Sequence, residues 1–248
     1  VDINTEYSEY GTAFYGKGEV VYTASRKPKS SKGTSNWTGE GYYDLYKGDF
    51  SEWNLTKEQN FSPVLNSLLN ESSPVFTRSL DTIYFTRNYQ VPQSKEEKRK
   101  KAEEKVLLEI YRSVRSGLNW SEPVRLPFNV TGYSVAHPAL SPDGKYLYFA
   151  ADINGTRGKS DIFRVRVNHK KGTYGKPENL GEIINTEGRL QRSVLEEVVK
   201  HYIRNGIFLK LIHNAHPTLT GLVYNIGQAF ELTLLDQVGS LLTHGFRI

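Results

Sequence analysis

The 248-residue sequence contains no cysteine and no methionine. The absence of cysteine excludes a disulfide scaffold, a thiolate metal site and a cysteine nucleophile. No apolar run comes near the roughly 18 residues that suggest a transmembrane helix, and no signal peptide precedes Val1, as expected of a mature product or an excised domain. A G-x-S-x-G nucleophile elbow, a P-loop and a dinucleotide-binding fingerprint are also absent. The common sequence signatures of hydrolases and nucleotide-binding enzymes are therefore missing.

The charge of the chain is modestly positive, with a formal net value of +5. Much of this charge lies in the run from Lys95 to Lys105, where acidic and basic residues alternate. Such alternation is typical of a solvated loop or a short surface helix, which we favour over an interaction patch for nucleic acid or an anionic surface. Aromatic residues make up 12% of the chain, a composition that suits half-buried β-strands.

The sequence contains a repeat. Tyr22, Tyr84 and Tyr148 take matching places in three units, 62 and 64 residues apart. A related triplet closes the third strand of each unit: Asp44-Leu-Tyr46, Glu109-Ile-Tyr111 and Asp161-Ile-Phe163. Self-similarity at a fixed period is typical of repeat architectures, so one supersecondary unit is expected to recur along the chain.

The junctions between the units repeat as well. An apolar residue followed by asparagine recurs at intervals of 62, 63 and 56 residues: Ile3-Asn4, Leu65-Asn66, Phe128-Asn129 and Ile184-Asn185. An aromatic turn and a short outer strand are expected before two of these junctions, over residues 120–126 and 174–180. Ser141-Pro-Asp-Gly144 is a turn sequence, because proline presets φ and glycine tolerates positive φ. Together, the turns, the triplets and the outer strands predict four short strands in each unit.

Four strands per unit and one recurring junction predict an all-β fold, a β-propeller of four-stranded antiparallel blades. The expected blades span residues 4–65, 66–128, 129–184 and 185–242, within one domain that covers residues 1–248. A further blade is expected to begin near residue 243. About four blades are therefore present, and the propeller needs more blades to close.

The motif His137-Pro-Ala-Leu-Ser-Pro-Asp-Gly-Lys145, with its following Leu-Tyr-Phe and Asp-Ile-Phe, resembles the WD40-like (PD40) repeat of TolB-type propellers. Longer segments narrow the resemblance: Glu9-Tyr-Gly-Thr-Ala-Phe-Tyr15, Glu71-Ser-Ser-Pro-Val-Phe-Thr77 and Tyr133-Ser-Val-Ala-His-Pro138. They are similar to the propeller of OmpA-family cell-envelope proteins of Bacteroidetes. This similarity covers roughly Asn4 to Arg189.

The resemblance implies a non-enzymatic scaffold of the periplasm that is associated with the outer membrane. Such proteins are implied to link an outer-membrane protein complex to peptidoglycan through a C-terminal OmpA-like domain, which is not visible in this sequence. Type IX secretion or gliding is the implied context. The resemblance implies no cofactor, no nucleic acid and no small-molecule substrate. Two other functions stay open, a surface glycan-binding protein and the propeller accessory domain of a hydrolase.

Beyond Arg189 the similarity weakens. Residues 190–203 locally favour a helix where the family continues with a strand, whereas residues 215–222 and 238–243 resemble a family loop and a junction. Length and these landmarks predict a fourth blade. Either its strands are divergent or carry a helical insertion, or the residues between the landmarks are imperfectly read.

Histidines and carboxylates offer little candidate chemistry. His137 and His216 each precede a proline in matching loops, which favours a structural role. His213 and His216 have a ligand-like spacing, but no carboxylate pattern completes a metal site. Asp143 and Asp161 recur with the fold, in a turn and at the start of a strand. We therefore predict no catalytic residue and no metal site.

One face of the propeller is the candidate binding surface. Its residues follow equivalent strands and are therefore expected to share this face: Arg26, Trp37, Arg87, Tyr89 and Asp152. Arginine and aromatic side chains are common anchors in protein interfaces. The sequence therefore predicts that these residues contact a protein partner.

Overall fold

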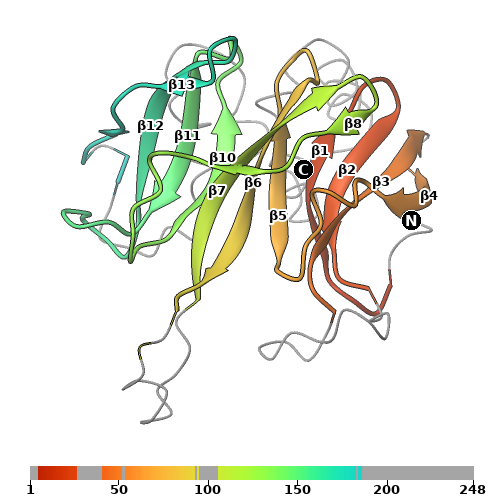
Figure 1. Cartoon of the computed structure of the whole chain (residues 1–248), viewed down its shortest axis with the longest axis horizontal. Helices are drawn as coiled ribbons and strands as arrows, with labels where there is room; N and C mark the ends of the chain where they lie inside the picture. Colours follow the sequence, from red (N-terminus) through yellow and green to blue (C-terminus); the bar gives the residue numbers. More distant parts are fainter. Residues whose placement is uncertain are drawn as a thin grey trace, which may run out of the picture.

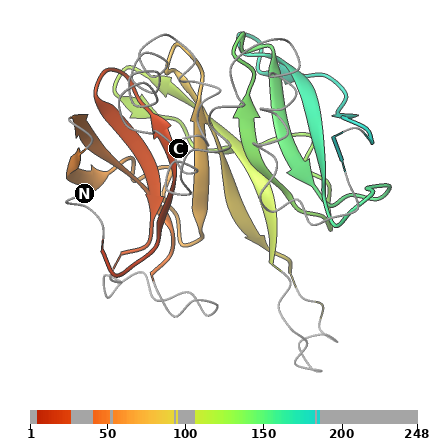
Figure 2. The ribbon, with the colours of Figure 1, turned by 180° about the vertical axis from the view of Figure 1, so that it is seen from behind.

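The computed structural model describes residues 5–26, 41–51, 54–92, 94, 106–182 and 184–185. Within these ranges the chain forms fourteen strands, arranged in three antiparallel sheets that stand side by side (Figure 1). Figure 2 shows the same three sheets from behind. None of the described residues lies in a helix that could cross a membrane. The prediction of an all-β fold is confirmed.

The strands follow chain order within each sheet. The first sheet contains β1 (Glu9–Phe14), β2 (Glu19–Ala24), β3 (Asp44–Ser51) and β4 (Asn54–Asn60). The second contains β5 (Glu71–Phe76), β6 (Thr82–Gln90) and β7 (Val106–Ser116), with β8 (Asn119–Trp120) and β9 (Val124–Arg125) both paired to β7. The third contains β10 (Val135–Leu140), β11 (Tyr146–Ala151) and β12 (Asp161–Asn168), with β13 (Thr173–Tyr174) and β14 (Glu178–Asn179) both paired to β12.

These sheets are blades of a β-propeller, because each is a short antiparallel meander and consecutive sheets pack face to face. The fourth position of a blade is one strand in the first sheet and two very short strands in the other two. The short outer strands lie where residues 120–126 and 174–180 predicted them. Beyond residue 185, the predicted fourth blade and the start of a fifth lie outside the described residues.

The strand register corrects one detail of the predicted repeat. Tyr22 pairs with Tyr46 as Phe85 pairs with Tyr111, and Tyr46 and Tyr111 both end the repeated triplet. Tyr22 is therefore equivalent to Phe85, and its predicted match with Tyr84 is wrong by one residue. The connection between the two inner strands is one residue shorter in the first sheet than in the second. Since a shift of one residue moves a strand's side chains to the other face, Tyr22 and Tyr84 point to opposite faces of their sheets.

The seams between sheets are apolar and also contain one recurring hydrogen bond. The first seam contains Val21, Leu45, Phe76, Ile83 and Phe85, and the second contains Tyr84, Ile110, Phe128, Leu147 and Phe149. A β-bulge interrupts each innermost strand. At the bulges of the second and third sheets, the N–H groups of Ser73 and His137 donate to Thr23 (3.3 Å) and Thr86 (2.9 Å) of the preceding sheet. Sequence-equivalent residues therefore join consecutive sheets.

Candidate functional site

All three sheets have an equivalent end, which we call the junction end. At this end the first strand of each sheet begins, the second strand ends and the third strand begins. The chain also passes from one sheet to the next here, through residues 61–70 and 126–134. Arg26, Arg87, Tyr89 and Asp152 all lie near the ends of β2, β6 and β11, and hence at this end. Trp37 lies outside the described residues. The opposite end, with the turns between the first two strands of each sheet, is called the turn end.

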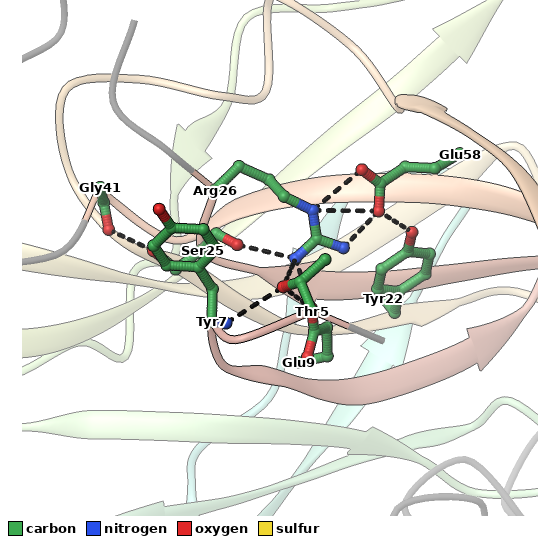
Figure 3. A network of polar contacts seen from close by, with 8 residues as sticks. All are labelled: Thr5, Tyr7, Glu9, Tyr22, Ser25, Arg26, Gly41 and Glu58. Atoms are coloured by element: carbon green, nitrogen blue, oxygen red, sulfur yellow. Dashed lines mark hydrogen bonds and ion pairs between the residues drawn. The ribbon is translucent and has the colours of Figure 1, made fainter. Parts of the chain in front are cut away.

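Arg26 is held inside the first sheet (Figure 3). Its Nη1 donates to Glu9 Oε1 at 2.5 Å, and its Nε donates to Glu58 Oε1 at 2.9 Å. The Tyr22 hydroxyl also donates to Glu58, at 2.5 Å. Burial and the Glu58 carboxylate raise the pKa of Tyr22, which keeps this hydroxyl protonated. Although burial opposes ionisation, the hydrogen bonds from Arg26 and Tyr22 lower the pKa of Glu58. Arg26 thus links the first, second and fourth strands.

Arg87 makes similar contacts in the second sheet, although the strand register aligns it with Ala24 and not with Arg26. Its Nε donates to Glu71 Oε1 at 2.7 Å, and its Nη2 donates to the Leu65 carbonyl at 2.8 Å. The guanidinium also lies over the rings of Phe85 and Tyr111, 5.3 and 5.0 Å from their centroids. These contacts are cation–π interactions, and they hold the side chain in one orientation.

Glu71 is the most deeply buried carboxylate of this end, with none of its surface exposed. It also accepts hydrogen bonds from the hydroxyl and N–H groups of Ser67. Burial raises the pKa of Glu71 to about 7, because it penalises the charged form more than Arg87 and Ser67 favour it. Its charge therefore changes near neutral pH.

The repeated junction asparagines explain how the sheets end. Asn129 accepts from the Ile110 N–H and donates to the Ile110 carbonyl, both at 2.8 Å. The same two-bond clamp holds Leu45 through Asn66 (2.8 and 3.0 Å) and Ile162 through Asn185 (2.8 and 3.1 Å). Each clamped residue is the middle of a repeated triplet. The repeated triplets and the repeated junction asparagines therefore form the same contact in each sheet.

Asp152 likewise makes an internal contact. Its carboxylate accepts from the Ser134 N–H at 2.6 Å, just as the Asn88 side chain accepts from Asn70 N–H in the second sheet. Tyr89, by contrast, keeps 36% of its surface exposed. The structure thus brings the four described candidates to one end but uses three of them to hold the sheets. Their contact with a partner stays a prediction.

The exposed apolar side chains at the same end were missed by sequence reasoning. Among the described residues, eight large apolar side chains are exposed, and six of these lie at the junction end: Tyr10, Val64, Leu68, Tyr89, Val106 and Val130. Leu118 and Val124 lie elsewhere. Sequence reasoning overlooked the position of these side chains in the chain, since Val64, Leu68 and Val130 lie within two residues of the junction asparagines.

No cluster of three or more histidine, aspartate or glutamate side chains in the described part of the chain could hold a metal ion. No family model and no curated protein matches the chain.

Among solved structures, the chain is similar to TolB from Acinetobacter baumannii, with 15% identity and a TM-score of 0.41 over 74% of this chain and 35% of TolB. It is also similar to a protein of unknown function from Dyadobacter fermentans (10% identity, TM-score 0.40, 69% and 50% covered). A third similar structure is a prolyl endopeptidase (14% identity, TM-score 0.36, 68% and 21% covered). The chain spans half or less of each of these proteins. The propeller assignment rests on the sheets and seams described above.

Proposed function

We propose that this chain is a non-enzymatic binding scaffold whose junction end docks a protein partner. The observation that carries the proposal is the concentration of exposed apolar side chains there, six of the eight among the described residues. Apolar and aromatic side chains framed by polar residues are characteristic of protein-binding surfaces.

The internal contacts of the junction end support the same function. Arg26, Arg87 and the junction asparagines connect strands and connectors through buried or half-buried hydrogen bonds. A surface that is already ordered loses less conformational entropy when a partner binds. The polar side chains therefore provide a rigid frame, and the exposed apolar side chains provide contact area.

The cellular setting is proposed from the family resemblance of the repeat motifs. We place the propeller in the periplasm, associated with an outer-membrane protein complex, as part of a protein that reaches peptidoglycan through a separate OmpA-like domain. Type IX secretion or gliding is the machinery that we propose it serves.

The test is capture of partners from native outer membranes after mild crosslinking. The variants Leu68→Asp and Val106→Asp place charges on the junction end, and Leu118→Asp is the matched control because Leu118 is 95% exposed at the turn end. We expect the first two to lose most of the captured membrane protein and the control to retain it. Equal capture by all three variants would refute docking at the junction end.

A further inference from the structure

The second candidate surface lies at the turn end, between the second and third sheets. Lys47, Arg112 and Arg164 are equivalent, since each follows its repeated triplet directly. Lys47 pairs with Glu19 at 2.6 Å, and Arg164 pairs with Glu178 at 2.9 Å. Arg112 has no carboxylate partner among the described residues. One of three equivalent cations therefore lacks its counter-ion.

Within the described part of the chain, Arg112 has no carboxylate among its hydrogen-bond partners. Nη2 donates to the His169 carbonyl at 3.4 Å, the guanidinium also hydrogen-bonds the Tyr84 hydroxyl, and the buried Nε has no partner among these residues. His169 Nε2 lies 2.6 Å from the Gly144 carbonyl, which can only accept, so Nε2 carries the hydrogen. His169 Nδ1 lies 3.2 Å from the Tyr84 hydroxyl. The polar groups around Arg112 are thus a backbone carbonyl, a phenol hydroxyl and an imidazole ring, and none of them is a carboxylate.

The surroundings of Arg112 add positive charge. The turn after β12 contains the exposed side chains of Lys170 and Lys171, for which the described residues provide no ion pair. Gly172 follows with φ +63°, and a Cβ there would meet Arg112 Nη1 at 3.1 Å. Glycine therefore lets this basic turn approach the guanidinium closely.

The nearby carboxylates do not neutralise this corner. Asp81 accepts hydrogen bonds from the hydroxyls of Thr77 and Thr82 in its own turn. Asp143 is bound by Ser141 and by Lys145 in the next sheet's turn. Asp143 is paired with Lys145, whereas Asp81 keeps its negative charge and faces His169. The three cations Arg112, Lys170 and Lys171 therefore outnumber the one carboxylate without an ion pair among the described residues of this corner.

We propose that Arg112 and the basic turn at residues 170–172 bind a carboxylate of an acidic segment in a partner protein. The carboxylate is the ligand that the two equivalent cations hold within their own sheets. The planar guanidinium can donate two parallel hydrogen bonds to such a group. This inference rests on the proposed scaffold function but assigns a second contact, at the end opposite the apolar surface.

The test uses the full chain and a fluorescein-labelled hexaglutamate peptide, with binding followed by fluorescence anisotropy at low salt. We expect wild-type protein to bind and Arg112→Gln to bind at least about tenfold more weakly, as expected for loss of a charge-assisted pair. Arg164→Gln is the matched control, because Arg164 already has Glu178 as its partner. Arg112→Lys keeps the charge without the fork and should bind with intermediate affinity.

Circular dichroism establishes that each variant is folded. Unchanged binding by both Arg112 variants, equal loss in Arg164→Gln, or no peptide binding at all would overturn the proposal. Tripolyphosphate is the competing probe: tighter, Arg112-dependent binding of tripolyphosphate than of the peptide would overturn the carboxylate assignment in favour of phosphate. Membrane capture through the junction end can succeed or fail independently, since Leu68 lies at the other end of the sheets.

Discussion

Replacing Glu71 by glutamine is expected to remove a pH-dependent loss of stability. Its carboxyl has a pKa of about 7 in the folded chain against an ordinary value of 4.5. Between these two values the folded state keeps a proton that the unfolded state releases, so raising the pH favours unfolding. The stabilisation is complete below about pH 4.5 and is lost above about pH 7.

The magnitude follows from the gap between the two pKa values. At about 1.4 kcal/mol for each tenfold difference in proton affinity, the gap corresponds to about 3 kcal/mol in the free energy of unfolding. Solvent screening does not reduce this free-energy value, because Glu71 has no exposed surface. Asp81 and Asp143, whose hydrogen bonds lower their pKa values, contribute pH dependence of the opposite sign. Wild type and variant share that contribution, so it cancels in their difference.

The assay is urea unfolding of wild type and Glu71→Gln at several pH values from 4.5 to 7.5. Near pH 4.5 the two proteins should have similar stability, because a protonated carboxyl and an amide are nearly isosteric. By pH 7.5 the wild type should have lost about 3 kcal/mol relative to the variant, with unchanged denaturant slopes. The reasoning would be refuted if the difference in unfolding free energy did not change with pH, or if it grew in favour of the wild type. Arg87 and Ser67 would then favour the charged form of Glu71 more than burial penalises it.

Three further substitutions test the contacts that hold the sheets, the first two by urea unfolding and the third by hydrogen exchange. Asn129→Ala leaves the buried N–H of Ile110 unpaired, whereas the Ile110 carbonyl still accepts from the Leu126 N–H, and should cost about 1–3 kcal/mol; a cost below about 0.5 kcal/mol would contradict the clamp. Thr86→Val removes the acceptor of the His137 N–H across the second seam and should cost about 1–2 kcal/mol. Gly48→Ala places a methyl group 2.7 Å from a backbone carbonyl of β4. Compared with wild type, hydrogen exchange should therefore accelerate more at the β4 amides than at the β2 amides.

Much of the fold could be predicted from the sequence because the repeats reflect repeated contacts. The triplets and the junction asparagines recur since each asparagine clamps the middle residue of a triplet. The register of the first unit was harder to predict, because a turn one residue shorter left Tyr22 and Tyr84 aligned by identity alone. Strand pairing establishes the register, and the sequence does not show that pairing. The identity of two tyrosines is weaker evidence for the register.

The candidate site was predictable only in its location. Equivalent strands must end at the same end of equivalent sheets, so the placement of Arg26 and Arg87 followed from the repeat. Their partners did not, because Glu58 and Glu71 approach them from other strands of the same sheets. The bulge residues were equally hidden, since Ser73 and His137 adopt positive φ without being glycine.

The asparagine clamps have a consequence for how the protein is made. Each clamp joins a third strand to a residue 19 to 23 positions further along the chain, in the segment that follows the sheet. During synthesis a sheet can therefore be completed as soon as that segment leaves the ribosome, and each new sheet needs only its predecessor to pack against. The polypeptide can add its sheets one at a time, in the order of translation. If translation stopped midway, the sheets already made would be complete, and only the last of them would lack a following sheet to pack against.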